Sequence, residues 1–160
     1  MKYSEFSIIR DTREKNGWFF DEEEKKPGKY RVVGTVVDTL DAGDYSIKGY
    51  EKLVRIERKN GFCELFGNFS PKDNNERFIR EMEKLKDIPH KYILIESQLT
   101  DDILGLSIPQ MRFGPPSSAI LKWLTEISIE YNVMPMFVGS CGKMVARYIF
   151  EHIAKKYNIC

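Results

Sequence analysis

The sequence has few features that would tie it to a membrane or to an oxidising compartment. No stretch approaches the roughly 18 consecutive apolar residues of a membrane-spanning helix, and the first residues lack the apolar core of a secretory signal peptide. The three cysteines, Cys63, Cys141 and Cys160, cannot all pair with one another and lack the spacing of metal ligands. We therefore expect a cytoplasmic protein with reduced thiols and no membrane partner.

The chain also lacks a strong net charge, internal repeats and low-complexity tracts. Its formal net charge of +1 does not by itself indicate a nucleic-acid partner. An acidic cluster at 21–24 offsets basic residues elsewhere, so a local basic surface remains compatible with this balance. At 160 residues, 42% of them hydrophobic, the chain is expected to form one domain, 1–160, that buries a sizeable core.

Hydrophobic periodicity predicts several strands first and then alternating helices and strands. Apolar runs predict strands at 7–10, 31–37, 45–47, 53–57, 91–96 and 134–138. Helical spacing predicts a short helical turn at 62–66 and helices at 75–86, 117–131 and 142–157. Asp73 or Asn74 is expected to cap the helix at 75–86, and 12–29 and 98–116 are expected to be irregular. This order predicts an α/β fold, with a mixed central β-sheet flanked by helices on its faces.

An aromatic cluster, Trp18-Phe19-Phe20, lies in the first irregular stretch. Aromatic side chains in a loop can stack on nucleic-acid bases or return to the hydrophobic core, where each ring buries a large apolar area. We expect these rings to fold back onto the core.

Two short runs indicate chemistry: Gly43-Asp44-Tyr45 and Ile56-Glu57-Arg58-Lys59. Side chains alternate between the faces of a strand, so Glu57 and Lys59 should share one face and Arg58 should point to the other. A pair of carboxylates can hold Mg²⁺, and a lysine beside the metal can orient or deprotonate a bound water. These are the parts that phosphodiester hydrolysis needs. Each run alone also has a purely structural explanation. Gly43-Asp44 is a common turn dipeptide, and the charged residues at 57–59 could simply be a solvated strand edge.

A third carboxylate, Asp11, closes the first predicted strand, while Asp44 and Glu57 lie at the ends of two others. If the first four strands lie side by side, these three acids can converge on one edge. Close carboxylates repel one another unless a cation lies between them. The pattern therefore predicts a metal site, with Mg²⁺ or Mn²⁺ as the cofactor and no organic cofactor.

These motifs, in this order, resemble the nuclease domain of XPF-type structure-specific nucleases. Asp11-Thr12-Arg13-Glu14, Gly43-Asp44-Tyr45 and Glu57-Arg58-Lys59 match that family's D-x-R-E, G-D-Y and E-R-K motifs. The resemblance continues through Arg77-Phe78 with Glu81, the strand that ends at Glu96, and 135–138, so it covers most of the chain. It implies the restriction-endonuclease-like fold of the PD-(D/E)XK class. The amino-acid sequence around the G-D-Y motif is similar to that of short stand-alone family members from phages and bacteria. We therefore expect a bacterial or phage-infected host cell.

The resemblance assigns the metal and the attacking water to four of the matching residues. It implies that Asp44 and Glu57 bind the metal, joined by the backbone carbonyl of Arg58. Asp11 would be a further acid of the metal site, acting directly or through a water. Lys59 would position or activate the attacking water.

The remaining motif residues would act on the nucleic acid. The resemblance implies that Arg13 and Arg58 contact phosphates, through the bidentate hydrogen bonds that suit arginine, and that Glu14 orients one of them. The implied reaction hydrolyses a DNA phosphodiester and leaves a 5′-phosphate and a 3′-hydroxyl.

The sequence departs from the family pattern in two places. The family has an aspartate six residues after the motif glutamate, where this chain has Cys63, and an acid follows one position later, at Glu64. Glu64 therefore either replaces that aspartate or marks a lost role. We also expect this chain to lack the tandem helix-hairpin-helix domain that many family members append, so selectivity for branched DNA would come from this domain, a dimer or a partner.

Further DNA contacts are expected near the beginnings of two predicted helices, because a helix N-terminus can bind phosphate through its free N–H groups. The candidates at the two helices are Lys72, Arg77 and Arg80, and Ser140, Lys143 and Arg147. The alternative is that Ser140 only caps its helix and that the basic side chains are solvated. His90 and His152 are expected to be structural or exposed.

Two classes of function are compatible with these motifs. The first is a Mg²⁺- or Mn²⁺-dependent DNA endonuclease of recombination or repair that acts on branched or junction DNA, with a homodimer expected from the family's habit. The second is a non-catalytic DNA-binding or scaffolding subunit. A nuclease of the same fold that acts on single strands or RNA is a third option.

Overall fold

The computed structural model describes residues 4–20, 30–99 and 117–159. Its centre is a six-stranded sheet with the order β2-β1-β3-β4-β5-β6. The strands are β1 (Ser4–Asp11), β2 (Tyr30–Asp38), β3 (Tyr45–Ile47), β4 (Val54–Lys59), β5 (His90–Ile95) and β6 (Met134–Phe137). The first four strands are neighbours, as the predicted convergence of acids required.

The sheet is mixed. β3 runs antiparallel to β1 and β4, its two neighbours, whereas β1–β2, β4–β5 and β5–β6 are parallel pairs. Parallel neighbours need a crossover connection, and α1 (Phe62–Phe69) and α2 (Lys72–Leu85) provide it between β4 and β5. α4 (Ser117–Tyr131) lies in the segment that connects β5 to β6.

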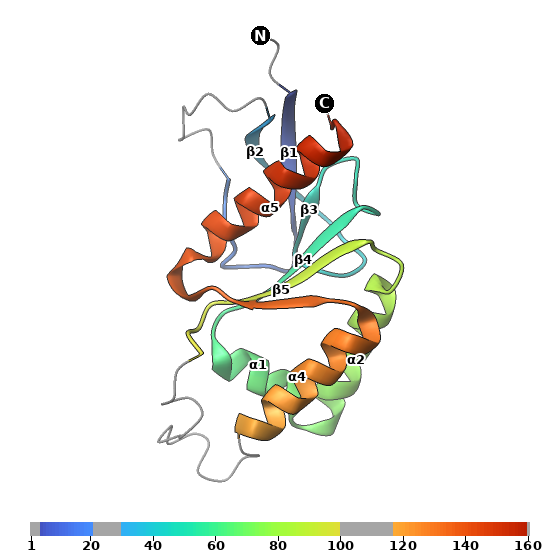
Figure 1. Ribbon diagram of the computed structural model, residues 1–160, viewed down its shortest axis with the longest axis vertical. Helices are drawn as coiled ribbons and strands as arrows, with labels where there is room; N and C mark the ends of the chain where they lie inside the picture. Colours follow the sequence, from blue (N-terminus) through green and yellow to red (C-terminus); the bar gives the residue numbers. More distant parts are fainter. Residues whose placement is uncertain (1–3, 21–29, 100–116, 160) are drawn as a thin grey trace.

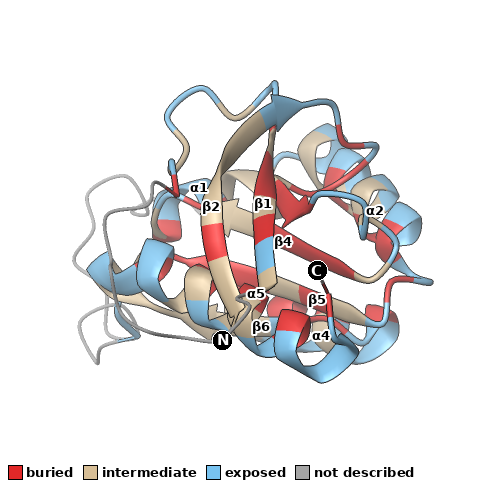
Figure 2. Ribbon diagram, turned by 90° about the horizontal axis from the view of Figure 1, so that it is seen from above, coloured by how far each residue is buried: buried red, intermediate tan, exposed pale blue. Residues whose placement is uncertain are grey.

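Helices cover both faces of the sheet. α1, α2 and α4 form one layer, and α5 (Gly142–Tyr157) lies across the opposite face (Figure 1). Two buried clusters result, one beneath each layer, and both reach the central strands, where buried residues gather in Figure 2. Ile56 of β4 packs in the cluster under α5, while Ile93 and Ile95 of β5 pack in the other. The even-numbered residues of β4 therefore face α5, and the odd-numbered residues face the layer of α1, α2 and α4.

Most predicted elements are confirmed, and the strand 45–47 and the helices 117–131 and 142–157 have the predicted bounds. The turn predicted at 62–66 is longer and forms α1. The predicted caps Asp73 and Asn74 are wrong, because α2 begins earlier, at Lys72, with Pro71 in the N-cap position and no side-chain cap. The Asn74 side chain instead donates to the carbonyl of Gly67 in α1 (3.0 Å).

The aromatic cluster folds back onto the core, as predicted. Phe20 is fully buried, and Trp18 stacks on Tyr45, with ring centroids 5.1 Å apart. The phenol oxygen of Tyr45 accepts a hydrogen bond from the backbone N–H of Trp18 (2.7 Å). Phe19 differs from the other two because it is half-exposed and lies under the guanidinium of Arg10.

Two further observations concern the membrane and the cysteines. No helix in the described part of the chain is long and apolar enough to span a membrane. Cys63 and Cys141 are free thiols on the surface, whereas Cys160 and most of the irregular stretch 98–116 lie outside the described residues.

Candidate active site

Glu57 and Lys59 lie together on one face of β4. They are two residues apart on a strand, so their side chains point the same way, and Lys59 Nζ lies 2.7 Å from Glu57 Oε1. Lys59 is buried, and its ammonium lies 5.1 Å from the ring centre of Phe78 in α2. Arg58 points to the opposite face, as the alternation predicted.

Asp44 reaches Glu57 through a tight approach of the backbone. Gly43 has a φ of +77°, a left-handed conformation that favours glycine. The backbone N–H of Asp44 then donates to the carbonyl of Ile56 (2.8 Å), and the backbone N–H of Arg58 donates to Asp44 Oδ2 (2.7 Å). The turn thus holds the Asp44 carboxylate against the strand that carries Glu57.

These three side chains line a polar pocket of about 470 Å³ between the sheet and the layer of α1 and α2. The other residues that line it are Arg13, Gly43, Glu64, Asn68, Arg77, Phe78 and Glu81. A pocket of similar size between α2 and α4 has mainly apolar walls, including Ile79, Trp123 and Ile127. We place the chemistry in the polar pocket, because converging acids and bases are found there.

The electrostatics of the pocket favour a cation. Burial, reinforced by repulsion from Glu57, raises the pKa of Asp44 well above its ordinary value. Burial alone would lower the pKa of Lys59, but the charge and hydrogen bond of Glu57 outweigh it, and the net direction is upward. A divalent cation would relieve the repulsion between Asp44 and Glu57.

The Asp44 and Glu57 carboxylates fit Mg²⁺ or Mn²⁺ in chemical type. Magnesium prefers oxygen ligands and is commonly held by one or two carboxylates together with waters. Among the described residues, no group of three or more His, Cys, Asp or Glu side chains is placed to hold a metal ion. Glu64 and Glu81 also line the pocket, and metal binding by Asp44 and Glu57 stays a prediction.

Asp11 lies at the same end of the sheet, but its carboxylate is engaged elsewhere. Its backbone N–H donates to the carbonyl of Asp44 (2.8 Å), so the two main chains are adjacent. Asp11 Oδ1 accepts from Arg13 Nε (2.7 Å), and Asp11 Oδ2 accepts from the backbone N–H of Leu40 (2.7 Å). Burial would raise the pKa of Asp11, but these hydrogen bonds lower it overall. Direct metal binding by Asp11 stays a prediction, because both of its oxygens already hold protein donors.

Arg13 is placed by this contact with Asp11. Its Nη2 also donates to the carbonyl of Leu40 (2.9 Å), yet 59% of the side chain is exposed and it lines the pocket. A guanidinium held on one side and open to solvent on the other can receive a phosphate oxygen.

Arg58 lies in a closed cluster beneath α5, which we call the Arg58 cluster: Arg58, Glu14, Glu96 and Trp18. Arg58 Nε donates to Glu96 Oε2 (2.7 Å), and Nη1 donates to Glu14 Oε1 (3.2 Å). The guanidinium carbon lies 5.1 Å from the Trp18 ring centre, and the side chain is only 10% exposed. Burial raises the pKa of Glu14, although the charge of Arg58 opposes the shift. Glu14 thus orients Arg58, but a phosphate contact by Arg58 would require its guanidinium to leave this cluster.

The structure gives Glu64 a place at the pocket. Its Oε2 accepts from the backbone N–H of Asn60 (2.7 Å), and its Oε1 lies 3.8 Å from Lys59 Nζ. Glu64 lies in the first turn of α1 and lines the pocket, while Cys63 beside it is exposed. An acid is therefore present near the position where the resemblance expects an aspartate, and its role stays a prediction.

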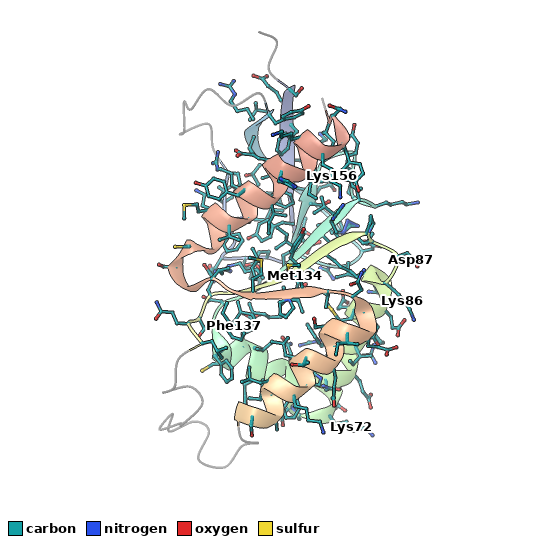
Figure 3. All side chains as sticks on the ribbon, in the orientation of Figure 1. Lys72, Lys86, Asp87, Met134, Phe137 and Lys156 are labelled. Carbon is teal, nitrogen blue, oxygen red and sulfur yellow. The ribbon has the colours of Figure 1, made fainter. Side chains whose placement is uncertain are left out.

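The expected DNA contacts are spread over the surface. Arg77 is exposed and lines the pocket, and Arg80 is exposed one turn further along α2. Lys72 lies at the end of the molecule formed by α2 and α4 (Figure 3), with its ammonium 3.6 Å from Glu76. Phosphate contacts by these three residues stay predictions.

The candidates around α5 lie away from the pocket lining. Lys143 is exposed in the first turn of α5, and Arg147 is half-buried one turn later. Ser140 as the cap of α5 is wrong: Cys141 takes the N-cap position without a side-chain hydrogen bond, because Ser140 is part of a 3₁₀ turn, Gly139–Cys141. Phosphate contacts by these residues stay predictions.

Two residues at the site were missed from the sequence. Asn68 lines the pocket one helical turn after Glu64, and its Oδ1 is buried without a hydrogen-bond partner among the described residues. Arg55 shares the face of Glu57 and Lys59 and holds the turn before Asp44. Both residues could have been found from the sequence. The alternation along β4 places Arg55 on the face of Glu57, and helical spacing places Asn68 one turn after Glu64.

Comparison with known proteins bears on the fold. No family model and no curated protein matches the chain. XPF from Aeropyrum pernix aligns with a TM-score of 0.52 and 16% identity, over 95% of this chain and 65% of that chain. XPF from Aeropyrum pernix in complex with DNA aligns with a TM-score of 0.56 and 15% identity, over 94% of this chain and 66% of that chain.

This chain thus spans just under two thirds of the length of those XPF chains, and nearly all of it aligns with them. The alignment, together with the mixed six-stranded sheet and its two helical layers, confirms the predicted α/β fold. The chain has the restriction-endonuclease-like fold of the XPF nuclease domain.

Proposed function

We propose that this protein is a Mg²⁺- or Mn²⁺-dependent DNA endonuclease. The observation that carries the proposal is the pocket in which Asp44 and Glu57 converge beside the buried ammonium of Lys59. A buried pair of acids that repel each other has no structural benefit without a cation. The likeness of fold to XPF supports a nuclease over other classes that use paired acids.

Each residue of the pocket has a distinct part in the proposed reaction. Asp44 and Glu57 would hold the metal, which when bound would stabilise the negative charge that develops on the phosphate. Lys59, fixed by Glu57, has further N–H groups with which it would orient the attacking water. Arg13 and Arg77, at the pocket, would bind the scissile and neighbouring phosphates. The products would be a 5′-phosphate and a 3′-hydroxyl.

The proposed substrate is branched or junction DNA, as in recombination and repair in the cytoplasm of a bacterial or phage-infected cell. One of the matching XPF structures is a complex with DNA, which supports DNA as the partner. The exposed positions of Arg13 and Arg77 beside a pocket that is open to solvent would allow a backbone to lie across it.

We further propose that the protein forms a homodimer. Two candidate surfaces are the aromatic loop and α5. The aromatic loop supplies little free area, because Trp18 and Phe20 pack into the core. α5 remains the better candidate, since Met144 and Tyr148 on it are about half-exposed. Light scattering at micromolar concentration should give twice the mass calculated from the sequence, and a monomeric mass would contradict the dimer.

Cleavage of end-labelled DNA tests the proposed activity. Flap, fork, Holliday-junction, duplex and single-stranded DNA, together with one RNA, would be incubated in Mg²⁺ and in Mn²⁺. The variant Lys59→Ala should abolish metal-dependent cutting. Its matched control is Lys91→Met, which removes a buried ammonium from the neighbouring strand β5, outside the polar pocket, and should still cut.

The outcomes separate the candidate functions. Metal-dependent cutting that Lys59→Ala removes and Lys91→Met retains supports the endonuclease. If only RNA or only single-stranded DNA is cut, that nucleic acid replaces branched DNA as the proposed substrate. Tight DNA binding with no cutting in either metal would favour a scaffolding subunit and overturn the proposal.

A further inference from the structure

The segment that delivers Asp44 to the pocket is braced by a buried arginine. Arg55 lies on β4, on the same face as Glu57 and Lys59, and is only 4% exposed. Arg55 is not among the residues that line the pocket. A guanidinium so far from solvent is costly to bury, so its contacts indicate what it does.

All three guanidinium nitrogens of Arg55 have partners. Nε donates to the carbonyl of Ala42 (3.1 Å), Nη1 to the carbonyl of Glu51 (2.6 Å), and Nη2 to Asp41 Oδ1 (2.7 Å). Because the guanidinium is planar and rigid, these bonds fix three points of the chain relative to β4. Two of the three lie in the segment immediately before Gly43 and Asp44.

Packing against Arg55 completes the brace. A Cβ placed on Gly43 would lie 3.6 Å from the Cβ and Cδ of Arg55, so the turn rests on the arginine's aliphatic stem. On the other side of the turn, Lys84 of α2 donates to the carbonyl of Asp41 (3.2 Å), but Lys84 is exposed. Arg55 thus gives the turn a buried side-chain support, in addition to the backbone hydrogen bonds of Asp44.

The partners of Arg55 do not suit a purely stabilising ion pair. Asp41 is its one acidic partner and is 70% exposed, while the other two partners are neutral carbonyls. Ion pairs of this kind contribute little net stability once the guanidinium has been desolvated. The arrangement instead holds backbone geometry beside an acid whose placement matters.

We propose that Arg55 is a positioning residue that fixes the Asp44 carboxylate for cation binding. The inference rests on the proposed function for the role of the cation, but the placement of Asp44 can be measured without it. The local sign of correct placement is the hydrogen bond from the Arg58 backbone N–H to Asp44 Oδ2.

The test compares Arg55→Met with Lys91→Met in the full chain. Lys91 is the register partner of Arg55 on β5, is 5% exposed, and also holds two backbone carbonyls, those of Lys86 and Ile88. Both variants remove a buried cation that braces a loop, but Arg55 alone contacts the segment before Asp44. Amide hydrogen exchange of Asp44 and Arg58 would be followed by NMR without metal, and Mn²⁺ affinity by calorimetry.

In Arg55→Met the Asp44 and Arg58 amides should exchange at least about tenfold faster than in Lys91→Met, and Mn²⁺ affinity should fall about tenfold, as for the loss of other residues that orient metal ligands. Arg55→Lys should restore part of both. Equal exchange at these amides in the two Met variants would overturn the inference. If Arg55→Met does not fold, Asp41→Ala takes its place in the comparison with Lys91→Met. Of the hydrogen bonds that Arg55 donates, Asp41→Ala removes only the one from Nη2 to the exposed Asp41 carboxylate.

The result is separable from the proposed function. Exchange at Asp44 and Arg58 is measured in metal-free protein, so local loosening would support the positioning role even if wild-type protein cut no DNA. Conversely, DNA cutting with unchanged exchange would support the nuclease and reject this role for Arg55.

Discussion

The two faces of β4 carry similar residues in opposite situations. On the pocket face, Asp44 approaches Glu57, and the ammonium of Lys59 lies 2.7 Å from Glu57 and 3.8 Å from Glu64. On the α5 face, Arg58 joins Glu14 and Glu96 in contacts that satisfy each carboxylate. Both faces combine acids with a basic residue of the same strand, but only on the α5 face does each of the two acids contact a guanidinium.

This difference shows how function can be recognised in a structure. A charge cluster whose acids all have arginine partners, as in the Arg58 cluster, needs nothing from outside. Burial raises the pKa of both Glu14 and Asp44. Glu14 contacts the Arg58 guanidinium, however, whereas the Asp44 carboxylate is held by a backbone N–H. A buried acid without a guanidinium or ammonium contact sacrifices stability, which is the usual mark of a site built for a ligand or a reaction. Changes on the pocket face should therefore affect activity, and changes on the α5 face should affect stability first.

The largest effect is expected from Glu57→Gln on the pocket face. It keeps the shape of the side chain but removes one proposed metal ligand, so cleavage should fall by about three orders of magnitude, the several kcal/mol that a catalytic metal supplies. The free energy of unfolding should fall modestly, because the buried ammonium of Lys59 loses its partner while Asp44 loses a repelling neighbour. Glu5→Gln, at an exposed ion pair with Arg31, is the control and should keep full activity. A Glu57→Gln protein with a tenth of wild-type activity or more would contradict this role.

Next in size is Arg58→Met on the α5 face. It leaves Glu14 and Glu96 buried without their cation, so the free energy of unfolding should fall by about 3 kcal/mol, measured by urea denaturation. The control Arg31→Met breaks the exposed pair with Glu5 and should cost at most about 0.5 kcal/mol. If Arg58→Met instead kept its stability and lost only DNA affinity, the phosphate role implied by the resemblance would be favoured over the Arg58 cluster.

A smaller loss is expected from Gly142→Ala, which tests how tightly α5 closes over this cluster. The new Cβ would lie 2.6 Å from Cζ2 of Trp18 and 3.2 Å from Cγ of Glu96, so Trp18 must shift, at a cost of about 2 kcal/mol. Gly67→Ala in α1, where nothing lies within 4 Å, should instead leave the unfolding midpoint unchanged or slightly raise it. Equal midpoints for the two variants would show that the α5 face is less closely packed.

The smallest effect on the free energy of unfolding, and one of opposite sign, is expected from Asp44→Asn. Removing a buried charge that Glu57 repels should raise the free energy of unfolding of metal-free protein by about 1 kcal/mol while abolishing metal binding. The raised pKa of Asp44 means that the folded state holds its proton more tightly than the unfolded chain. Wild-type stability therefore decreases as the pH rises through this window.

The gain in Asp44→Asn should accordingly be present at neutral pH and vanish below about pH 4, where the carboxyl is protonated in both states. Urea denaturation in the presence of a chelator, repeated at both pH values, measures it. Destabilisation at neutral pH would mean that the Asp44 charge is already balanced by a protein partner.

Much of the fold could be predicted because its signals are local. The apolar stripe of 117–131 and that of 142–157 give the bounds of α4 and α5, and the alternation of β4 separates Glu57 and Lys59 from Arg58. The start of α2 at Lys72 could not be predicted from a capping side chain, since Pro71 in the N-cap position makes no side-chain hydrogen bond.

The site was predicted less completely than the fold. Of the runs 43–45 and 56–59, the residues Gly43, Asp44, Glu57 and Lys59 line the pocket. The sequence could not show that Asp11 gives both its oxygens to Arg13 and Leu40, nor that Arg55 braces the turn before Asp44, because these partners depend on which strands become neighbours.

By itself, therefore, the sequence determined the secondary structure, the alternation of charged residues along β4 and the acids available for a metal, since each follows from spacing along the chain. Only the tertiary structure decided which charges are paired and which are left to repel. That outcome depends on the sheet order, which places Asp44 beside Glu57, and on the layer of α5, which excludes water from Arg58 and its partners. Neither the neighbours of a strand nor the solvent around a charge is written in local sequence.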